Sequence, residues 1–145
     1  MFKKLNLVKI RNSLRNFVVD LNLLLLRKGF GISIGEGTIV SLKAQLDKTN
    51  PKGLVIGNYC YLAADCLILS HDYINREHVN TVLGNNIFVG AKAIVLPGVS
   101  VADNVIIAAG AVVNKSVTQS NVILAGNPAK IVAQDVRIGQ HGRKV

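Results

Sequence analysis

A repeat of six residues is the feature of this sequence that most restricts what the chain can fold into. Counted in steps of six, one series of positions carries only aliphatic side chains: Leu83, Val89, Val95, Val101, Ile107 and Val113. A second series, four residues further on, holds small or medium-sized apolar residues: Ile87, Ala93, Val99, Val105, Ala111 and Val117. The positions just before the second series are mostly Asn or Gly, which tolerate a positive φ; they are Asn86, Lys92, Gly98, Asn104, Gly110 and Ser116.

The three series together predict an all-β solenoid, a parallel β-helix. In each unit, the first residue points inward and stacks on its equivalent in the next coil. The Asn or Gly position makes a corner, and the smaller apolar residue fills the narrower space beside that corner. Three units close one triangular coil, so that residues three units apart form neighbouring parallel strands. The spacing alone does not fix the handedness of the coil.

The same pattern continues upstream in two shifted registers. One holds Ile34, Val40 and Leu46, and the other holds Ile56, Leu62 and Ile68. Neither joins the register of Leu83 in steps of six, which predicts inserted residues around 48–53 and around 72–82. Cys60 and Cys66 fall on the small inward position, so we expect both to be reduced core residues of a protein from a reducing compartment.

Residues 2–26 have helical spacing instead. Apolar residues recur every three or four positions: Leu7, Ile10, Leu14, Phe17, Val18, Leu21, Leu24 and Leu25. The opposite face carries Lys9 and Arg15, and Gly29 and Gly31 end the helix. Its apolar face either packs against the β-helix or a neighbouring subunit, or makes a peripheral contact with a membrane. The expected organisation is an amphipathic helix in 1–30, a β-helix in 31–132 with an excursion loop at 72–82, and a basic tail in 133–145.

Charge and hydropathy limit the partners. A net charge of +9, concentrated at the two ends, favours anionic partners such as nucleic acid, lipid head groups or a phosphorylated cofactor. No nucleic-acid motif is present, so we expect no nucleic-acid partner. The apolar run from Leu23 to Leu26 is far shorter than the ~20 residues that span a membrane, and no cleavage site of small residues follows it. We expect a cytoplasmic protein, with a peripheral position at the inner membrane face left open.

From Ile56 to Val132 the sequence resembles the hexapeptide-repeat acyltransferases, in particular the sugar and polysaccharide O-acetyltransferases. The matching runs are Phe88-Val89-Gly90-Ala91, Val95-Leu96-Pro97-Gly98-Val99, Ala108-Ala109-Gly110-Ala111-Val112-Val113-Asn114-Lys115 and Ala125-Gly126-Asn127-Pro128-Ala129-Lys130. The resemblance implies a left-handed parallel β-helix, a homotrimer, and acetyl-CoA bound as co-substrate in the cleft between adjacent subunits.

A second resemblance, to polysaccharide O-acetyltransferases, lies in Leu69-Ser70-His71-Asp72, directly before the second insertion. It implies that His71 is the catalytic base. Counted from Ile68, His71 also falls on a corner position, where a His tolerates a positive φ and would point outward. A partner must fix its tautomer. Asp72, Glu77 and a backbone carbonyl are open choices, and Asp72 is also assigned to the substrate.

Carried over residue by residue, the resemblance also implies a binding site for acetyl-CoA. Gly90, Ala91 and Ala109 would give backbone contacts to the pantetheine arm. Lys115 and Lys130 would lie near the nucleotide phosphates, and no metal is expected. The expected function is an O-acetyltransferase that moves an acetyl group from acetyl-CoA to a sugar hydroxyl, in a polysaccharide or its precursor.

Three other functions are compatible with the expected fold. Ile39 and Ser41 stand where maltose- and galactoside-type enzymes carry a Tyr and an Asn that contact the sugar, so the acceptor pocket differs and those substrates do not transfer. The acceptor could instead be serine or an amine. A metalloenzyme similar to gamma-type carbonic anhydrases would need three His ligands. The chain has only His71, His78 and His141, the last of them in the tail. The β-helix could also serve as a non-catalytic subunit.

Overall fold

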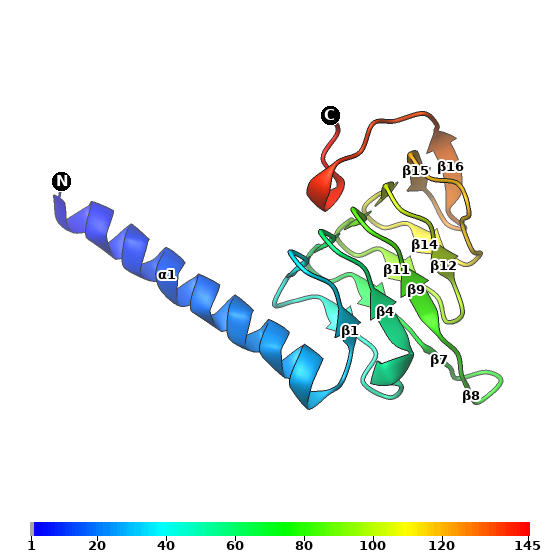
Figure 1. Ribbon diagram of the computed structural model, residues 1–145, viewed down its shortest axis with the longest axis horizontal. Coiled ribbons are helices and arrows are strands. Elements are labelled where there is room, and N and C mark those ends of the chain that lie inside the picture. The colour runs from blue at the N-terminus through cyan, green and yellow to red at the C-terminus, as the bar shows by residue number, and fades with distance from the viewer. Residues whose placement is uncertain (1) are drawn as a thin grey trace.

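The computed structural model describes residues 2–145, with side chains from Asn6 onward. Met1 and the basic side chains of Lys3 and Lys4 lie outside this part. The chain begins with helix α1 (Phe2–Leu24), which continues into a π-helical turn, η1 (Leu25–Gly29). The helix thus ends at Gly29, as the sequence predicts. It projects from one end of a parallel β-helix that the following residues build (Figure 1).

The β-helix has three faces, each made of parallel strands stacked one coil above the next. Face A holds β1 (Ser33–Ile34), β4 (Leu54–Ile56), β9 (Thr81–Leu83) and β12 (Ser100–Val101). Face B holds β2 (Ile39–Val40), β5 (Tyr61–Leu62), β10 (Phe88–Val89), β13 (Val105–Ile107) and β15 (Val122–Ala125). Face C holds β3 (Gln45–Leu46), β6 (Leu67–Ile68), β11 (Ile94–Val95) and β14 (Val112–Val113). The chain visits A, B and C in turn, which confirms the predicted solenoid.

The core is the interior column of aliphatic side chains that the repeat predicts. Every member of the first series, from Leu83 to Val113, is at most 3% exposed. Most strands of the three faces are only two residues long, and in these the second residue points inward, because neighbouring side chains of a strand face opposite sides. The predicted corners have positive φ at Asn86, Lys92, Gly98, Asn104 and Gly110, whereas Ser116 does not. Cys60 and Cys66 are buried free thiols of this core, as expected.

Strand register locates both insertions. In the regular coils, Leu83 pairs with Val101, 18 residues later. Leu46 pairs with Ile68 and Ile68 pairs with Val95, so the two earlier coils are longer. The first insertion forms the 3₁₀ turn η2 (Pro51–Gly53). The second forms an antiparallel hairpin of β7 (His71–Asp72) and β8 (Glu77–His78).

Polar side chains reinforce the corner between faces A and B. The Asn58 side chain accepts a hydrogen bond from the Glu36 N–H, and the Asn85 side chain accepts one from the Asn58 N–H, both at 2.8 Å. The Asp103 carboxylate accepts one from the Asn85 N–H at 2.7 Å. These side chains form a ladder that ties each coil to the next.

The far end of the β-helix is closed by the chain itself. Strand β16 (Lys130–Ala133) pairs antiparallel with β15, with a register shift at Ile123 and Leu124. The tail then turns back along the β-helix and forms η3 (Gln140–Gly142). There the His141 N–H donates to the Tyr59 carbonyl, and its Nε2 lies 2.7 Å from the carbonyl oxygen of Gly37. The basic tail is therefore packed on the early coils.

Candidate functional site

His71 lies at the corner where the chain passes from face C to face A, here called the CA edge. The chain leaves the coil at Ser70 and continues into β7, and the coil resumes at Thr81, which takes the small inward position and is 1% exposed. His71 is not among the residues of the described chain with positive φ. The prediction of a positive-φ corner at His71 is therefore wrong, because the inserted hairpin begins at that position.

Three polar residues, here called the corner clamp (Asp47, Asn50 and Ser70), hold the root of the hairpin. The Ser70 N–H donates to Asp47 Oδ2 at 3.0 Å, and the Ser70 hydroxyl donates to the Asn50 carbonyl at 2.7 Å. In return, Asn50 Nδ2 donates to the Ser70 carbonyl at 2.8 Å. Both insertions of the chain therefore meet at this corner, and the residue directly before His71 is bonded at its N–H, its carbonyl and its side chain.

Asp47 is a buried acid that the sequence reasoning missed. Its side chain is 6% exposed, and its Oδ1 accepts a hydrogen bond from the Thr49 N–H at 2.8 Å. Burial alone would raise the pKa of the carboxyl, but backbone hydrogen bonds from Ser70, Thr49 and Asn50 outweigh it and lower the pKa below its ordinary value. The available signal was an acid two residues before Thr49, the pattern of an Asx turn.

The imidazole of His71 is fixed by aromatic contacts. Its ring packs edge-to-face on Tyr73, with ring centroids 4.2 Å apart, and on His78 across the hairpin, at 5.2 Å. Its Nδ1 is shut off from solvent and has no hydrogen-bond partner among the described residues. Neither Asp72 nor Glu77 supplies the expected orienting hydrogen bond in this structure.

Asp72 shapes the turn of the hairpin. Its Oδ1 accepts hydrogen bonds from the N–H groups of Ile74, at 2.9 Å, and Asn75, at 3.1 Å. Its Oδ2 accepts one from the Asn75 side chain at 2.7 Å. The backbone hydrogen bond from Asn75 is the main cause that lowers the pKa of this carboxyl. The assignment of Asp72 to the substrate stays a prediction.

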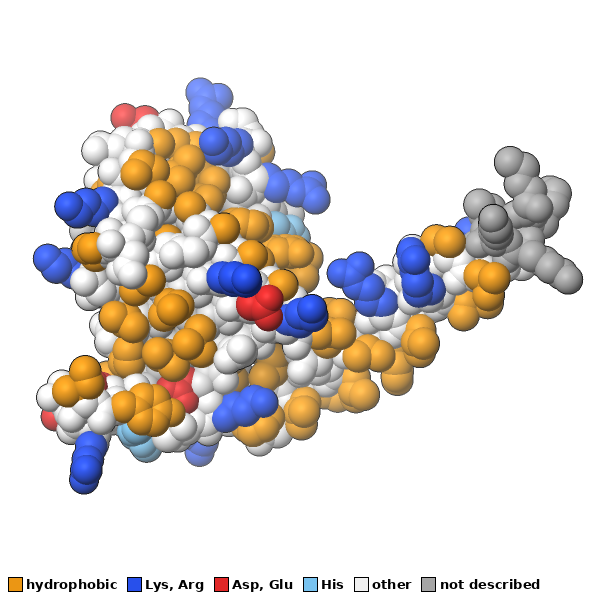
Figure 2. Space-filling model, turned by 180° about the vertical axis from the view of Figure 1, so that it is seen from behind, with side chains coloured by type: hydrophobic (Ala, Val, Ile, Leu, Met, Phe, Trp, Pro, Cys, Tyr) orange, Lys and Arg blue, Asp and Glu red, His pale blue; other side chains and the backbone are white. Residues whose placement is uncertain are grey.

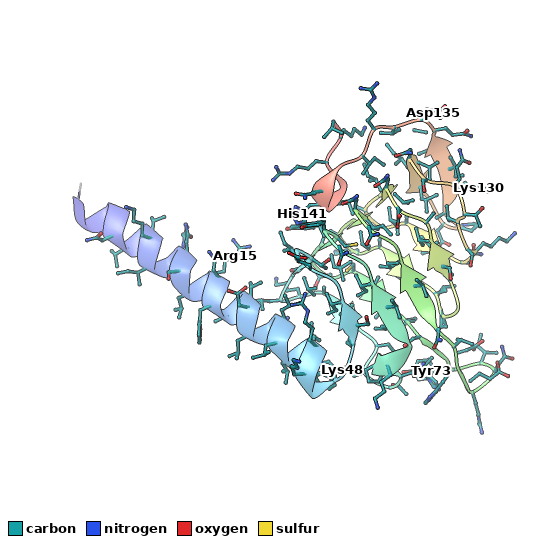
Figure 3. The ribbon with its side chains drawn as sticks, in the orientation of Figure 1. Arg15, Lys48, Tyr73, Lys130, Asp135 and His141 are labelled. Atoms are coloured by element: carbon teal, nitrogen blue, oxygen red, sulfur yellow. The ribbon has the colours of Figure 1, made fainter. Side chains whose placement is uncertain are left out.

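A groove of about 620 Å³ opens next to the hairpin. Leu26 of η1 lines one side, the outer surface of face C around Gln45 and Leu67 forms the floor, and Tyr73 lines the other side. Tyr73 also touches the His71 ring, and its hydroxyl lies 3.3 Å from that of Thr49. Figure 3 shows Tyr73 and Lys48, a further lining residue, at the same end of the β-helix as the base of α1. Tyr73 thus lines the groove and also contacts the His71 ring.

The residues expected to contact the pantetheine arm meet at a different corner, where the chain passes from face B to face C (the BC edge). Gly90 and Ala109 occupy this corner in successive coils, and a Cβ on Gly90 would lie 2.5 Å from the Ala109 nitrogen. The Gly90 N–H is used by the Ile107 carbonyl. Ala91 and Ala109 are exposed, and their N–H groups have no backbone acceptor within the described chain. These two N–H groups are free to bind a ligand amide.

The two lysines lie apart. Lys130 is exposed at the start of β16, directly after a turn whose Ala129 N–H donates to the Val112 carbonyl, so it lies above the BC edge (Figure 3). Lys115 follows β14 and is exposed on the CA edge, the edge that also carries His71. Within one chain the expected site residues therefore occupy two edges that border face C.

The described residues contain no group of three or more His, Cys, Asp and Glu side chains arranged to hold a metal ion. His71 and His78 face each other on the hairpin, whereas His141 is bonded at the corner between faces A and B. No helix in the described chain is long and apolar enough to cross a membrane.

Comparison with known proteins agrees with the repeat and the fold. Residues 80–115 match the family model described as bacterial transferase hexapeptide (six repeats). The protein YvoF of Bacillus subtilis, assigned as an acetyltransferase, is 27% identical over 103 residues. That alignment covers 70% of this chain and 59% of YvoF. The chain thus spans less than two thirds of the length of this relative.

Two solved structures share the fold. A hexapeptide-repeat acetyltransferase of Vibrio cholerae, in complex with acetyl-CoA, is 22% identical with a TM-score of 0.62, over 71% of this chain and 60% of that one. A maltose O-acetyltransferase of Clostridium difficile is 25% identical with a TM-score of 0.61, over 76% of this chain and 72% of that one. These likenesses confirm the expected left-handed parallel β-helix.

Proposed function

We propose that this chain, whose residues 80–115 match the hexapeptide transferase model, is an acetyl-CoA-dependent O-acetyltransferase that acts on a saccharide hydroxyl with His71 as general base. The observation that carries the proposal is the position of the His71 imidazole at the CA edge. Aromatic contacts hold the ring, and hydrogen bonds to Ser70 hold the root of its hairpin. The similarity to acetyltransferases, one of them a maltose O-acetyltransferase, supports the reaction type and the acceptor class.

The chemistry needs one group that accepts a proton. A sugar hydroxyl is a poor nucleophile at neutral pH, and an imidazole can take its proton as the oxygen attacks the thioester carbonyl. The tetrahedral oxyanion then collapses, the carbon–sulfur bond breaks, and the proton passes from the imidazolium to the departing thiolate. We assign proton transfer to Nε2, because Nδ1 is shut off from solvent. Backbone N–H groups are suited to stabilise the oxyanion.

The small residues of the BC edge suit the pantetheine arm of acetyl-CoA. The exposed N–H groups of Ala91 and Ala109 can donate to its amide carbonyls, and Gly90 keeps the two coils close enough to present both. Lys130 is placed to attract phosphates at the same edge. We assign Lys115, on the CA edge, to phosphate contacts as well.

We propose a homotrimer, because the two sets of site residues cannot meet within one chain. His71 and Lys115 lie on the CA edge, whereas Gly90, Ala91 and Ala109 lie on the BC edge. A threefold axis parallel to the β-helix would set the CA edge of one subunit against the BC edge of the next.

The acceptor site is assigned to the groove beside Tyr73. An aromatic wall and exposed polar groups such as Gln45 and Thr49 are the side chains that bind sugars by stacking and hydrogen bonds. We propose a polysaccharide or its precursor as the acceptor that binds in this groove. We expect the reaction in the cytoplasm, where acetyl-CoA is made and buried thiols stay reduced.

The test is acetyl transfer from acetyl-CoA to a panel of saccharides, serine and simple amines, followed by mass spectrometry. His71→Ala should lower kcat by about 10²–10⁴-fold, as expected for loss of a general base. Its binding of acetyl-CoA, measured by calorimetry, should stay unchanged. His141→Ala is the matched control, since it removes an imidazole that lies at the corner between faces A and B, away from His71, and should keep most activity. Transfer by His71→Ala at the wild-type rate would refute the base assignment, and transfer to serine alone would refute the saccharide acceptor.

A further inference from the structure

Helix α1 carries an apolar stripe that nothing in the described chain covers. Seven of its side chains, spaced three or four residues apart, are each more than half exposed: Leu7, Ile10, Leu14, Phe17, Leu21, Leu24 and Leu25, the last in η1. At 3.6 residues per turn these positions fall on one side of the helix. A soluble helix normally buries such a stripe against its own domain, so the stripe indicates a partner outside this chain.

The direction of the stripe excludes the chain's own β-helix as that partner. Figure 2 shows hydrophobic side chains along the edge of α1 that faces away from the β-helix, and basic side chains mostly along the opposite edge. Only the last turns reach the core, where Leu26 is 6% exposed and Leu23 packs against it. A flat surface can therefore contact the stripe along the helix without meeting the rest of the molecule.

The charges beside the stripe select the partner. Arg11 follows Leu7 by four residues and lies beside the edge of the stripe, whereas Lys9 and Arg15 lie further round, on the opposite face. Figure 3 shows Arg15 reaching out on the side opposite the stripe's outer edge. Lys9 and Lys28 add exposed positive charge, and Asp20 is the one acid of α1. A helix with an apolar face and a basic polar face has the composition of helices that lie in the plane of an anionic membrane.

We infer that α1 docks on an anionic lipid surface, with the stripe among the upper acyl chains and the long basic side chains of Lys9, Arg11 and Arg15 reaching phosphate groups. A second copy of α1 is the less suitable occupant, because two α1 helices would bring their own Arg and Lys side chains together. The helix would lie on the membrane and not cross it. This inference does not depend on the proposed acetyl transfer.

The test is co-sedimentation of the full chain with vesicles of phosphatidylcholine alone or with about 30% phosphatidylglycerol. The wild type should bind the anionic vesicles more tightly, by about fivefold for each engaged Arg or Lys, and should dissociate at high salt. Leu14→Glu with Phe17→Glu should lower binding at least tenfold. The matched control is Asn12→Glu with Asn16→Glu, which adds the same charge to the opposite, exposed face and should lose far less.

Circular dichroism shows whether both variants keep wild-type structure, and light scattering gives their oligomeric state. Equal loss of binding in the two variants would overturn the inference, because charge alone would then explain it. Equal binding of the wild type to neutral and anionic vesicles would overturn the role of the arginines. No vesicle binding, with a smaller oligomer for Leu14→Glu and Phe17→Glu, would assign the stripe to a second copy instead.

Discussion

Replacing Asp47 with Asn tests the corner clamp, because it keeps the size of the side chain and removes its charge. The carboxylate accepts hydrogen bonds from the Ser70 and Thr49 N–H groups in a site that is 6% exposed. An amide has one oxygen, so one of these N–H groups would face an NH₂ group instead. A hydrogen bond to a charged group contributes about 1.5–3 kcal/mol, and a buried unpaired N–H costs about 1–3 kcal/mol. We expect a loss of about 3 kcal/mol, which for a chain of this size lowers Tm by roughly 10 °C.

The effect should disappear in acid. The pKa of Asp47 is lower in the folded chain than in the unfolded chain, so its stabilising effect is fully present above the ordinary pKa of 3.8. It is lost as the pH falls through the lower folded value. Thermal unfolding followed by circular dichroism between pH 7 and pH 2.5 should therefore show a difference between wild type and Asp47→Asn that shrinks below about pH 4.

The same variant should affect catalysis through His71. Loosening Ser70 moves the hairpin root, so kcat should fall and the pH profile of kcat should shift, while the affinity for acetyl-CoA stays the same. Asp103→Asn is the control, because it removes a carboxylate bonded to a backbone N–H at the opposite corner. A Tm within 2 °C of wild type for Asp47→Asn would refute the clamp, as would an equal loss of kcat in Asp103→Asn.

Three further predictions concern the core and the BC edge. Burial raises the pKa of Cys66 to about 12, so this thiol should not react with a disulfide reagent at pH 8 until the chain unfolds; rapid labelling of the native protein would contradict its burial. Gly90→Ala should cost about 1–3 kcal/mol in the free energy of unfolding, because its Cβ would lie 2.5 Å from the next coil. Gly110→Ala meets no atom within 4 Å and should cost less, through its φ of +71° alone; denaturant titration compares the two. Lys130→Ala should raise KM for acetyl-CoA about fivefold with kcat unchanged, and an unchanged KM would remove Lys130 from the phosphate site.

The repeat could be predicted from the sequence because each inward residue sees neighbours at fixed offsets along the chain. Val89 pairs with Ile107, 18 residues later, and the same offset joins Leu83 to Val101 and Val95 to Val113, so each inward position predicts its neighbour in the next coil. The two insertions were found as breaks in this pattern. Their internal structure follows no repeat, and this is why the sequence left it open.

The corner clamp could not be predicted for a related reason. Asp47 and Ser70 belong to different coils, and they meet only because both insertions leave the β-helix at the same corner. That coincidence depends on insertion length and on three-dimensional register, which composition does not encode. The wrong expectation at His71 has the same origin, since counting from Ile68 assumed that the coil continued. The stripe on α1 was visible in the sequence, but its direction away from the β-helix was not.

The antiparallel strand β16 prevents further coils from being added to the end of this β-helix. A stack of parallel coils has an open top, where the last coil offers free N–H and C=O groups to any chain of the same pattern. Here β16 pairs antiparallel with β15, with a register shift, and Lys130 is the first residue of β16. No further parallel coil can therefore be added to this end of the β-helix. Removal of residues 130–145 would expose β15, and we expect such a fragment to join end to end into filaments. Strand β16 thus blocks end-to-end stacking of one β-helix on another.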